Sequence, residues 1–180
     1  MMKNAISILI FALVLFANTN IYAQNPPQRG YRGFAETGYS FGLGNEGMNR
    51  FEISTTHGFQ FNEHLFIGGG VAYHSFHKNG FNWEGVPVFG EIRGDWFRGK
   101  FSPFASAKLG YNTGDVEGLY FAPAAGCRYA FGKKFGLNLS LGYSLQMADF
   151  IELNYDHGQM GIDYKKKNSG AITLKLGFDF

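Results

Sequence analysis

The sequence contains very little cysteine and no excess of charge of one sign. Cys127 is the one cysteine among 180 residues, so no disulfide can form within the chain. Sixteen Lys and Arg residues stand against 14 Asp and Glu residues. A nucleic-acid-binding protein would be expected to carry a basic stripe. The sequence therefore excludes nucleic acid as the expected partner.

Long hydrophobic runs are missing after the first 23 residues. Lys3 precedes an apolar run from Ala5 to Ala17, and small Ala23 follows a short polar stretch. This order is typical of a secretory signal peptide, and the run is shorter than the roughly 20 residues of a membrane-spanning helix. We expect export through the Sec pathway. The expected division is a cleaved signal peptide at 1–23, a lead-in at 24–30 and one domain at 31–180.

Glycine and aromatic residues are abundant, with 26 Gly, 20 Phe and 10 Tyr. Average glycine usage is about 7%, and this chain has about twice that share. The last ten residues alternate apolar and polar side chains at every position. A period of two indicates a strand with one apolar and one polar face. Similar alternation predicts eight strands, at about 32–43, 50–60, 65–74, 86–97, 102–112, 119–131, 135–146 and 171–180.

The charged residues within these strand cores all fall on the polar face. They are Glu36, Glu52, Glu91, Arg93, Asp95, Lys108, Arg128, Lys175 and Asp179. The rest of that face is rich in Gly, Ala and Ser, whereas a solvated exterior would carry more Lys and Glu. A narrow eight-stranded lumen is filled by side chains, and charges buried there must pair. We expect these nine residues to form a lumen charge network, with the apolar face toward lipid. The alternative is a soluble, lipocalin-like barrel with the apolar face inside.

The connections between the predicted strands differ in length. Tight turns are predicted at 61–64, 98–100 and 132–134, and long loops at 75–85 and 147–170. Short periplasmic turns opposite longer outer loops are typical of an outer-membrane barrel. Apolar-face aromatic residues gather at both ends of the strands, which predicts two interfacial girdles. Both chain termini are expected in the periplasm.

Several segments resemble the small OmpA/OmpX-type outer-membrane β-barrel family. They are Gly58–Asn62 leading into Leu65–Gly70, then Val86–Arg93 and Leu139–Tyr143. The resemblance implies an all-β fold, an eight-stranded antiparallel up-and-down transmembrane β-barrel in the outer membrane of a Gram-negative envelope. It implies no catalytic residues and no cofactor. It also implies that the aromatic end, Phe178 and Phe180, is the signal read by the barrel-assembly machinery.

The leading hypothesis for function is a monomeric, non-enzymatic surface protein whose lumen is plugged by salt bridges. Its loops would contact the envelope or an external partner, as in adhesion. Lys165, Lys166 and Lys167 could bind lipopolysaccharide, since clustered bases near a membrane attract anionic head groups; a solvated loop is the equal alternative.

Two other classes of function stay open. One is a lipid A-modifying enzyme that uses His74 and Ser75 in a loop. The other is a porin-like narrow pore through the charged lumen. A metal site at His74, His77 and Glu84 has weak support, because two histidines three residues apart in a loop are not diagnostic. His57 is expected at the membrane interface, and Cys127 is expected to face lipid.

Overall fold

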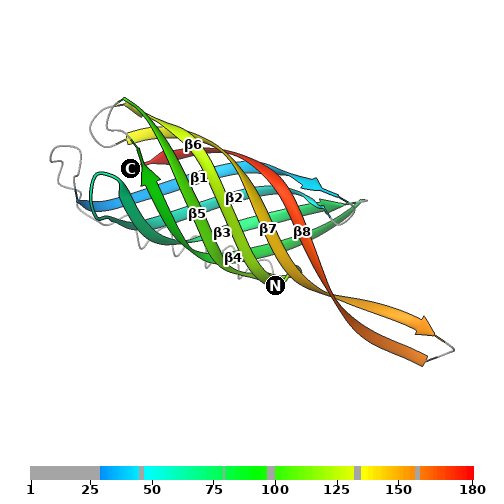
Figure 1. Ribbon diagram of the computed structural model, residues 1–180. Coiled ribbons are helices and arrows are strands. Elements are labelled where there is room, and N and C mark those ends of the chain that lie inside the picture. The colour runs from blue at the N-terminus through cyan, green and yellow to red at the C-terminus, as the bar shows by residue number, and fades with distance from the viewer. Residues whose placement is uncertain (1–28, 45–46, 79, 97–99, 132–134, 157–158) are drawn as a thin grey trace, which may run out of the picture.

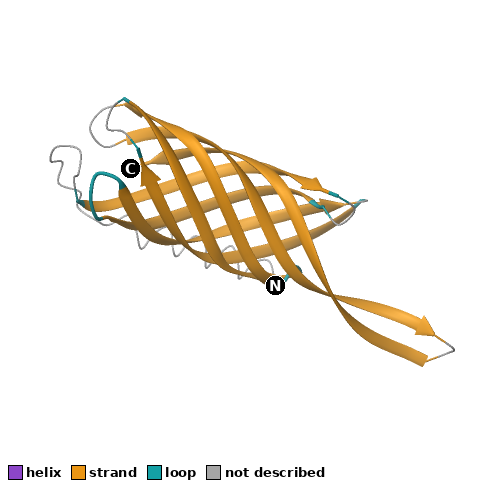
Figure 2. Ribbon diagram, in the orientation of Figure 1, coloured by secondary structure: helices purple, strands orange, loops and turns teal. Residues whose placement is uncertain are grey.

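The structure is a computed structural model that describes residues 29–44, 47–78, 80–96, 100–131, 135–156 and 159–180. The expected signal peptide and most of the lead-in lie outside these residues. The described chain forms eight strands that close into a barrel (Figure 1, Figure 2). The described residues contain no helix that is long and apolar enough to cross a membrane. The strands are β1 Gly30–Leu43, β2 Asn49–Gln60, β3 Leu65–Lys78, β4 Phe81–Asp95, β5 Phe101–Gly114, β6 Gly118–Phe131, β7 Phe135–Asp156 and β8 Gln159–Asp179.

Each strand pairs antiparallel with the next, and β8 returns to pair with β1. The Phe180 N–H donates to the Gly33 carbonyl at 3.0 Å, and the Gly33 N–H donates to the Phe180 carbonyl at 2.8 Å. The prediction of an eight-stranded antiparallel barrel is confirmed. We call the end of the barrel at Phe180 the turn end. The opposite end, where β1 leads into β2 near Leu43, is the ribbon end.

The two faces of the wall differ sharply in chemistry. The residues of the predicted apolar face point outward, and large apolar side chains are exposed along the strands, for example Ile53, Val88, Leu109, Leu141 and Leu176. Among the described residues, 22 polar or charged residues are buried against 11 hydrophobic ones. A soluble barrel would bury its apolar face instead. This chain therefore has its polar side inside.

The loop predicted at 75–85 is wrong, because both flanking strands continue through it. β3 runs to Lys78 and β4 begins at Phe81, with Lys78 opposite Phe81 and His74 opposite Gly85. The alternation of inward and outward positions continues through the segment, and Gly80 adopts a positive φ of 82° at the reversal. Only glycine takes such a conformation readily. Because Lys78 pairs with Phe81, the turn is confined to the short segment between these two residues.

The long loop predicted at 147–170 is also wrong. β7 and β8 continue past the barrel as a two-stranded ribbon, with Ala148 opposite Lys167 and Asp156 opposite Gln159. β6 stops pairing with β7 at Ala148. Figure 1 shows this ribbon projecting beyond the other strands. The extra length on this side lies in strands, so short turns do not face long loops as the sequence had suggested.

Two prolines interrupt the hydrogen-bonded ladders of the wall. Between β3 and β4, register pairs are absent at Pro87 and its neighbour Val86. Between β6 and β7, they are absent between Phe121 and Ala124, at Ala122 and Pro123. Proline has no N–H to donate, so it weakens a sheet wherever a ladder bond is due. The other six ladders run without a gap through the pairs they form.

Candidate functional site: a charged lumen

The centre of the lumen pairs carboxylates with two lysines. The Lys108 ammonium on β5 contacts Glu36 on β1, and its Nζ lies 3.6 Å from Oε2 of Glu91 on β4. The Nζ atom of Lys175 on β8 lies 2.5 Å from Oε1 of Glu52 on β2. All five residues are buried. Because β1 and β5 are not neighbours in the wall, the Lys108–Glu36 pair crosses the lumen and joins opposite walls.

Toward the ribbon end, Glu52 accepts further contacts. The Nε atom of Arg50 lies 3.1 Å from Oε2 of Glu52, and Nε2 of His74 lies 3.5 Å from the same oxygen. The Arg50 guanidinium also donates to Oγ of Ser144 at 2.7 Å and to Oγ of Ser40 at 3.2 Å. One carboxylate is therefore shared by Arg50, Lys175 and His74.

Toward the turn end, two aspartates are shared by three arginines. The Nη1 atom of Arg32 lies 2.5 Å from Oδ2 of Asp95, and its Nη2 lies 3.5 Å from Oδ2 of Asp179. Arg128 reaches the same Asp179 oxygen at 2.5 Å, and Arg93 lies 3.5 Å from Oδ1 of Asp95. Charge-assisted contacts of this kind are the strong hydrogen bonds of protein interiors. They tie β1, β4, β6 and β8 together.

Aromatic rings fill the space between these charges. The Arg93 guanidinium carbon lies 3.4 Å from the ring centroid of Phe104 and 4.5 Å from that of Phe34. Phe34 in turn packs edge-on against Phe66 at 5.0 Å. A guanidinium over a ring face is attracted by the ring quadrupole, so the rings stabilise a buried cation as well as filling the lumen.

An apolar cluster closes the lumen at the ribbon end. Met48, Phe76 and Val116 are buried together, and Trp83 packs against them. Met48 and Val116 belong to the segments between strands, whereas Phe76 and Trp83 sit opposite each other on β3 and β4. We call this cluster the apolar cap, and it lies at the ribbon end of the charged lumen.

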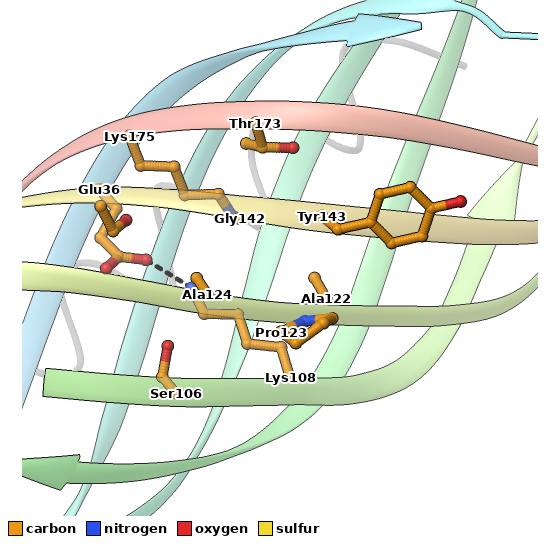
Figure 3. Close-up of a pocket in the computed structure, with 11 residues that line it drawn as sticks. Glu36, Ser106, Lys108, Ala122, Pro123, Ala124, Gly142, Tyr143, Thr173 and Lys175 are labelled. Carbon is orange, nitrogen blue, oxygen red and sulfur yellow. Dashed lines mark hydrogen bonds and ion pairs between the residues drawn. The ribbon is translucent and has the colours of Figure 1, made fainter. Parts of the chain in front are cut away.

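The interior leaves little free space. The cavity in Figure 3 has a volume of about 10 Å³ and is lined in part by Glu36, Lys108 and Lys175. A cavity of this size holds about one water molecule. The lumen of an eight-stranded barrel is just wide enough for side chains to fill. In this barrel, charged and aromatic side chains fill it.

All nine charged residues predicted for the lumen lie on its inner face. Eight of them are buried, and the Arg128 side chain is 19% exposed. The structure adds Arg32, Arg50 and His74, which sequence reasoning did not include. Arg32 and Arg50 occupy the same alternate positions as Glu36 and Glu52, so the alternation places them on the inner face. Both lie near strand ends, outside the strand cores from which the lumen residues were predicted.

The proposed loop site at His74 and Ser75 is not assembled. His74 is fully buried in the lumen, whereas Ser75 is the next residue of β3 and points to the other face. The pair therefore cannot act as nucleophile and base, which must lie within hydrogen-bond reach. His77 is exposed near the end of β3, and no cluster of three or more potential metal ligands is present in the described part of the chain.

Two further residues lie on the outer face as predicted from their positions. His57 contacts the Tyr31 hydroxyl through Nδ1 at 2.5 Å and the Thr55 hydroxyl through Nε2 at 2.9 Å. Cys127 is half-buried on β6. His57 is thus held by neighbouring polar groups, as an interfacial histidine would be.

The glycine run of β3 serves packing. An added Cβ on Gly68 would lie 2.6 Å from the Phe66 ring, and one on Gly70 would lie 2.9 Å from the Phe89 ring. These two positions face the lumen, so glycine makes room for the rings. A strand on both sides of the run rules out the helix that a phosphate-binding loop would need.

The aromatic end of the chain lies on the outside of the seam. The rings of Phe178 and Phe180 are stacked with centroids 6.2 Å apart, and Phe135 stacks on Phe178 at 5.5 Å. The Phe180 ring covers Gly33, where an added Cβ would lie 2.7 Å from it. The last aromatic residues therefore pack over the joint between β8 and its neighbours.

No protein-family model and no curated protein matches the sequence. Solved structures do match. Neisserial surface protein A (NspA) matches with a TM-score of 0.63 and 12% identity over 85% of this chain and 98% of its own. A de novo designed transmembrane β-barrel matches with a TM-score of 0.50 and 13% identity over 88% and 98%. The outer membrane enzyme PagL gives 0.49 and 10% over 80% and 97%. This chain has the fold of the small eight-stranded outer-membrane β-barrels.

Proposed function

We propose that the protein is an integral outer-membrane barrel whose outer face contacts lipid. One observation carries this proposal: apolar side chains are exposed along every strand of the barrel wall, while ion pairs are buried inside. In water such an exposed apolar surface would drive aggregation. In a bilayer the same surface is solvated by lipid, and the closed sheet pairs the backbone everywhere except at the two proline interruptions.

The test is gel mobility of envelope-extracted protein with and without boiling. A folded barrel resists detergent and migrates differently until it is heated. We expect a heat-dependent shift for protein from the outer-membrane fraction. A protein recovered from the soluble periplasm, with no shift, contradicts the proposal.

We further propose that the lumen is a plug and not a pore. The ion pairs that cross the lumen, the rings around Arg93 and the apolar cap all occupy space that a solute would need. Planar bilayers containing the purified protein should stay silent. Discrete conductance steps that change when Lys108 is replaced would favour the porin-like alternative.

The ribbon at 149–169 is the part that we propose acts outside the membrane. Beyond Ala148 on β7 and before Gly170 on β8, neither strand pairs with a third strand of the described chain. Both edges thus present unpaired backbone groups, which template pairing with another strand. A two-stranded ribbon is only marginally stable alone in water. Binding to an external partner, as in adhesion, would supply the missing contacts.

Lys165, Lys166 and Lys167 lie in this ribbon near the barrel, and their side chains are outside the described residues. We propose that they bind lipopolysaccharide phosphates, because clustered bases at a membrane surface attract anionic head groups. A variant with all three changed to glutamine should bind lipopolysaccharide micelles more weakly. The matched control changes Lys100, at the turn end, to glutamine. Equal loss in both variants would contradict a contact at the ribbon.

Deletion of 150–165 tests the adhesive role directly. The barrel wall ends at Ala148, so we expect the heat-dependent shift to persist while binding of cells to a partner surface is lost.

Folding is proposed to use the barrel-assembly machinery, with Phe178 and Phe180 as the signal. The assembled protein is proposed to be a monomer.

A further inference from the structure

The ribbon has one apolar face and one polar face. The β7–β8 register runs without a gap from the turn end to Asp156 opposite Gln159, so the alternation of the barrel wall continues into the ribbon. Positions at even spacing from the exposed wall residues Met147 and Ile172 therefore form one face of the ribbon. Register and sequence place six large apolar residues on that face: Ile151, Leu153, Tyr155, Met160, Ile162 and Tyr164.

This apolar face is separate from the outer face of the wall. Asp149 and Lys166 are register partners at the base of the ribbon, on the same face as the six apolar residues. They form a charged row between the wall and the apolar rows. The β3–β4 hairpin reaches the same end of the barrel, and its outward positions are all polar: Ser75, His77, Asn82 and Glu84. The ribbon differs from that hairpin because its outward face becomes apolar again.

The apolar face has no partner within the described chain. Figure 1 shows the ribbon projecting beyond the other strands, with no described element beside its outer part. Apolar patches of this kind mark interaction sites. A specific contact buries on the order of 800 Å² on each partner. Six residues of this size bury on the order of 100 Å² each, so the face supplies most of the area that such a contact needs.

The face is symmetric about its middle row. Leu153 and Ile162 are register partners, and the apolar rows of Ile151 and Tyr155 lie two residues to either side. A two-fold axis through the middle row therefore sets the apolar rows of a second copy against these rows, with the two ribbons antiparallel. A face that is complementary to itself in this way forms a closed, symmetric pair.

The charges of the ribbon favour the same antiparallel arrangement. The base is basic and the outer part is acidic: Lys165, Lys166 and Lys167 lie at the base, and Glu152, Asp156 and Asp163 lie beyond it. The rows of Lys165 and Asp156 are each three residues from Leu153, so the two-fold axis sets one opposite the other. A parallel arrangement would bring like charges together. Complementary charges of this kind fix orientation and suppress wrong pairings.

We propose that the apolar face of the ribbon binds the same face of a second copy that projects from a facing membrane. Ribbons from two facing membranes point in opposite directions, which gives the antiparallel arrangement that the charges favour. Each barrel stays a monomer in its own membrane. The inference rests on the proposed action of the ribbon outside the membrane, and it names the partner as another copy of this chain.

Clustering of vesicles tests the contact. The full chain is reconstituted in phosphatidylcholine vesicles that carry a donor or an acceptor dye, and energy transfer between the two populations is measured. We expect transfer between two protein-containing populations and none between protein-containing and protein-free vesicles. Leu153→Asp should lower the transfer roughly tenfold or more, because each contact loses a buried leucine from both copies.

Asn154→Asp is the matched control, because it adds the same residue to the polar face of the ribbon. It should leave the transfer within about twofold of the parent value. Equal loss in Leu153→Asp and Asn154→Asp would overturn the assignment of the contact to the apolar face.

A second variant tests the orientation and does not depend on the apolar face. It exchanges the charges through Glu152→Lys, Asp156→Lys, Asp163→Lys, Lys165→Glu, Lys166→Glu and Lys167→Glu, and its net charge equals that of the parent. Vesicles with this variant should cluster with one another. They should not cluster with parent vesicles, because the base of each ribbon then meets an outer part of the same sign. Equal clustering with parent vesicles would overturn the antiparallel contact.

Two further results would overturn the inference. Equal transfer to protein-free vesicles would show that lipid covers the apolar face. Absence of clustering by a parent protein that keeps its heat-dependent shift would show that two copies do not bind. After either result, the proposed adhesive role still stands if deletion of 150–165 abolishes binding of cells to a partner surface. That role fails by itself if the deletion leaves the binding unchanged.

Discussion

The two halves of the lumen bury charge with different numbers of acids. In the turn half, Asp95 and Asp179 are shared by three arginines, and Arg32 reaches both. In the ribbon half, Glu52 serves Arg50, Lys175 and His74, and an apolar cap lies beyond them. Loss of either aspartate leaves Arg32 in contact with the other one. Loss of Glu52 removes the carboxylate that both Arg50 and Lys175 contact.

Replacing the single acceptor should have the largest effect. Within the described part of the chain, Glu52→Gln leaves Arg50 and Lys175 buried with no other carboxylate in contact. Removing one partner of a buried ion pair typically costs roughly 3–5 kcal/mol. Urea unfolding in phospholipid vesicles, followed by tryptophan fluorescence, measures the free energy of unfolding. A loss below about 1 kcal/mol would mean that other groups support these cations and that the halves are alike.

The matching change in the turn half should cost less. In Asp95→Asn, Arg32 keeps Oε1 of Gln60 at 2.9 Å and Oδ2 of Asp179 at 3.5 Å. Arg93 loses its 3.5 Å contact with the Asp95 carboxylate but keeps the rings of Phe34 and Phe104. We expect a loss of about 1–3 kcal/mol, typical of a weakened charged hydrogen bond. The same urea titration measures it. If Asp95→Asn is as damaging as Glu52→Gln, sharing of acceptors does not protect the turn half.

The contribution of the apolar cap to stability is expected to depend on the volume of its side chains and not on charge. Val116→Ala removes two methyl groups from the cluster with Met48 and Phe76. At about 0.8 kcal/mol for each buried carbon, the expected loss is about 1–2 kcal/mol. Fluorescence of Trp83, which packs on this cluster, should shift to the red as water enters. An unchanged spectrum would show that the cap does not exclude water.

The smallest effect is expected outside the lumen. Cys127→Ala changes a half-buried residue on the outer face, next in sequence to Arg128 of the turn-half network. Substitutions away from buried features usually stay within about 0.5 kcal/mol. The urea midpoint should stay near that of the parent. A larger loss of stability would mean that Cys127 makes a contact on the outer face that stabilises the barrel.

The inward and outward faces could be predicted from the sequence because strand alternation is strict. Glu36 and Lys175 fall on the polar face by counting residues, and both are buried in the lumen. Which acid meets which base could not be predicted. The pairing of Lys108 with Glu36 joins β5 to β1 across the closed barrel, and that contact depends on how the sheet closes and not on local periodicity.

The ribbon shows where the sequence reasoning failed. Ile151, Leu153 and Tyr155 alternate with polar residues, which is a strand pattern. Asp149 and Phe150 break the alternation just before it, and Lys165–Lys167 suggested a solvated loop. Pairing of β7 with β8 continues through these residues because the register set within the barrel wall places each residue of β7 opposite a residue of β8. Cross-strand continuity outweighed the local irregularity.

The two proline interruptions also divide the wall mechanically. The ladders within β4–β5–β6 are continuous, and so are those from β7 through β8 and β1 to β3. The barrel is thus two stiff panels that meet at two creases. Such a tube flattens more easily along one direction than the other. In the bilayer that we propose surrounds the barrel, lateral pressure would therefore change its cross-section from rounder to more elliptical, with the creases as the hinges.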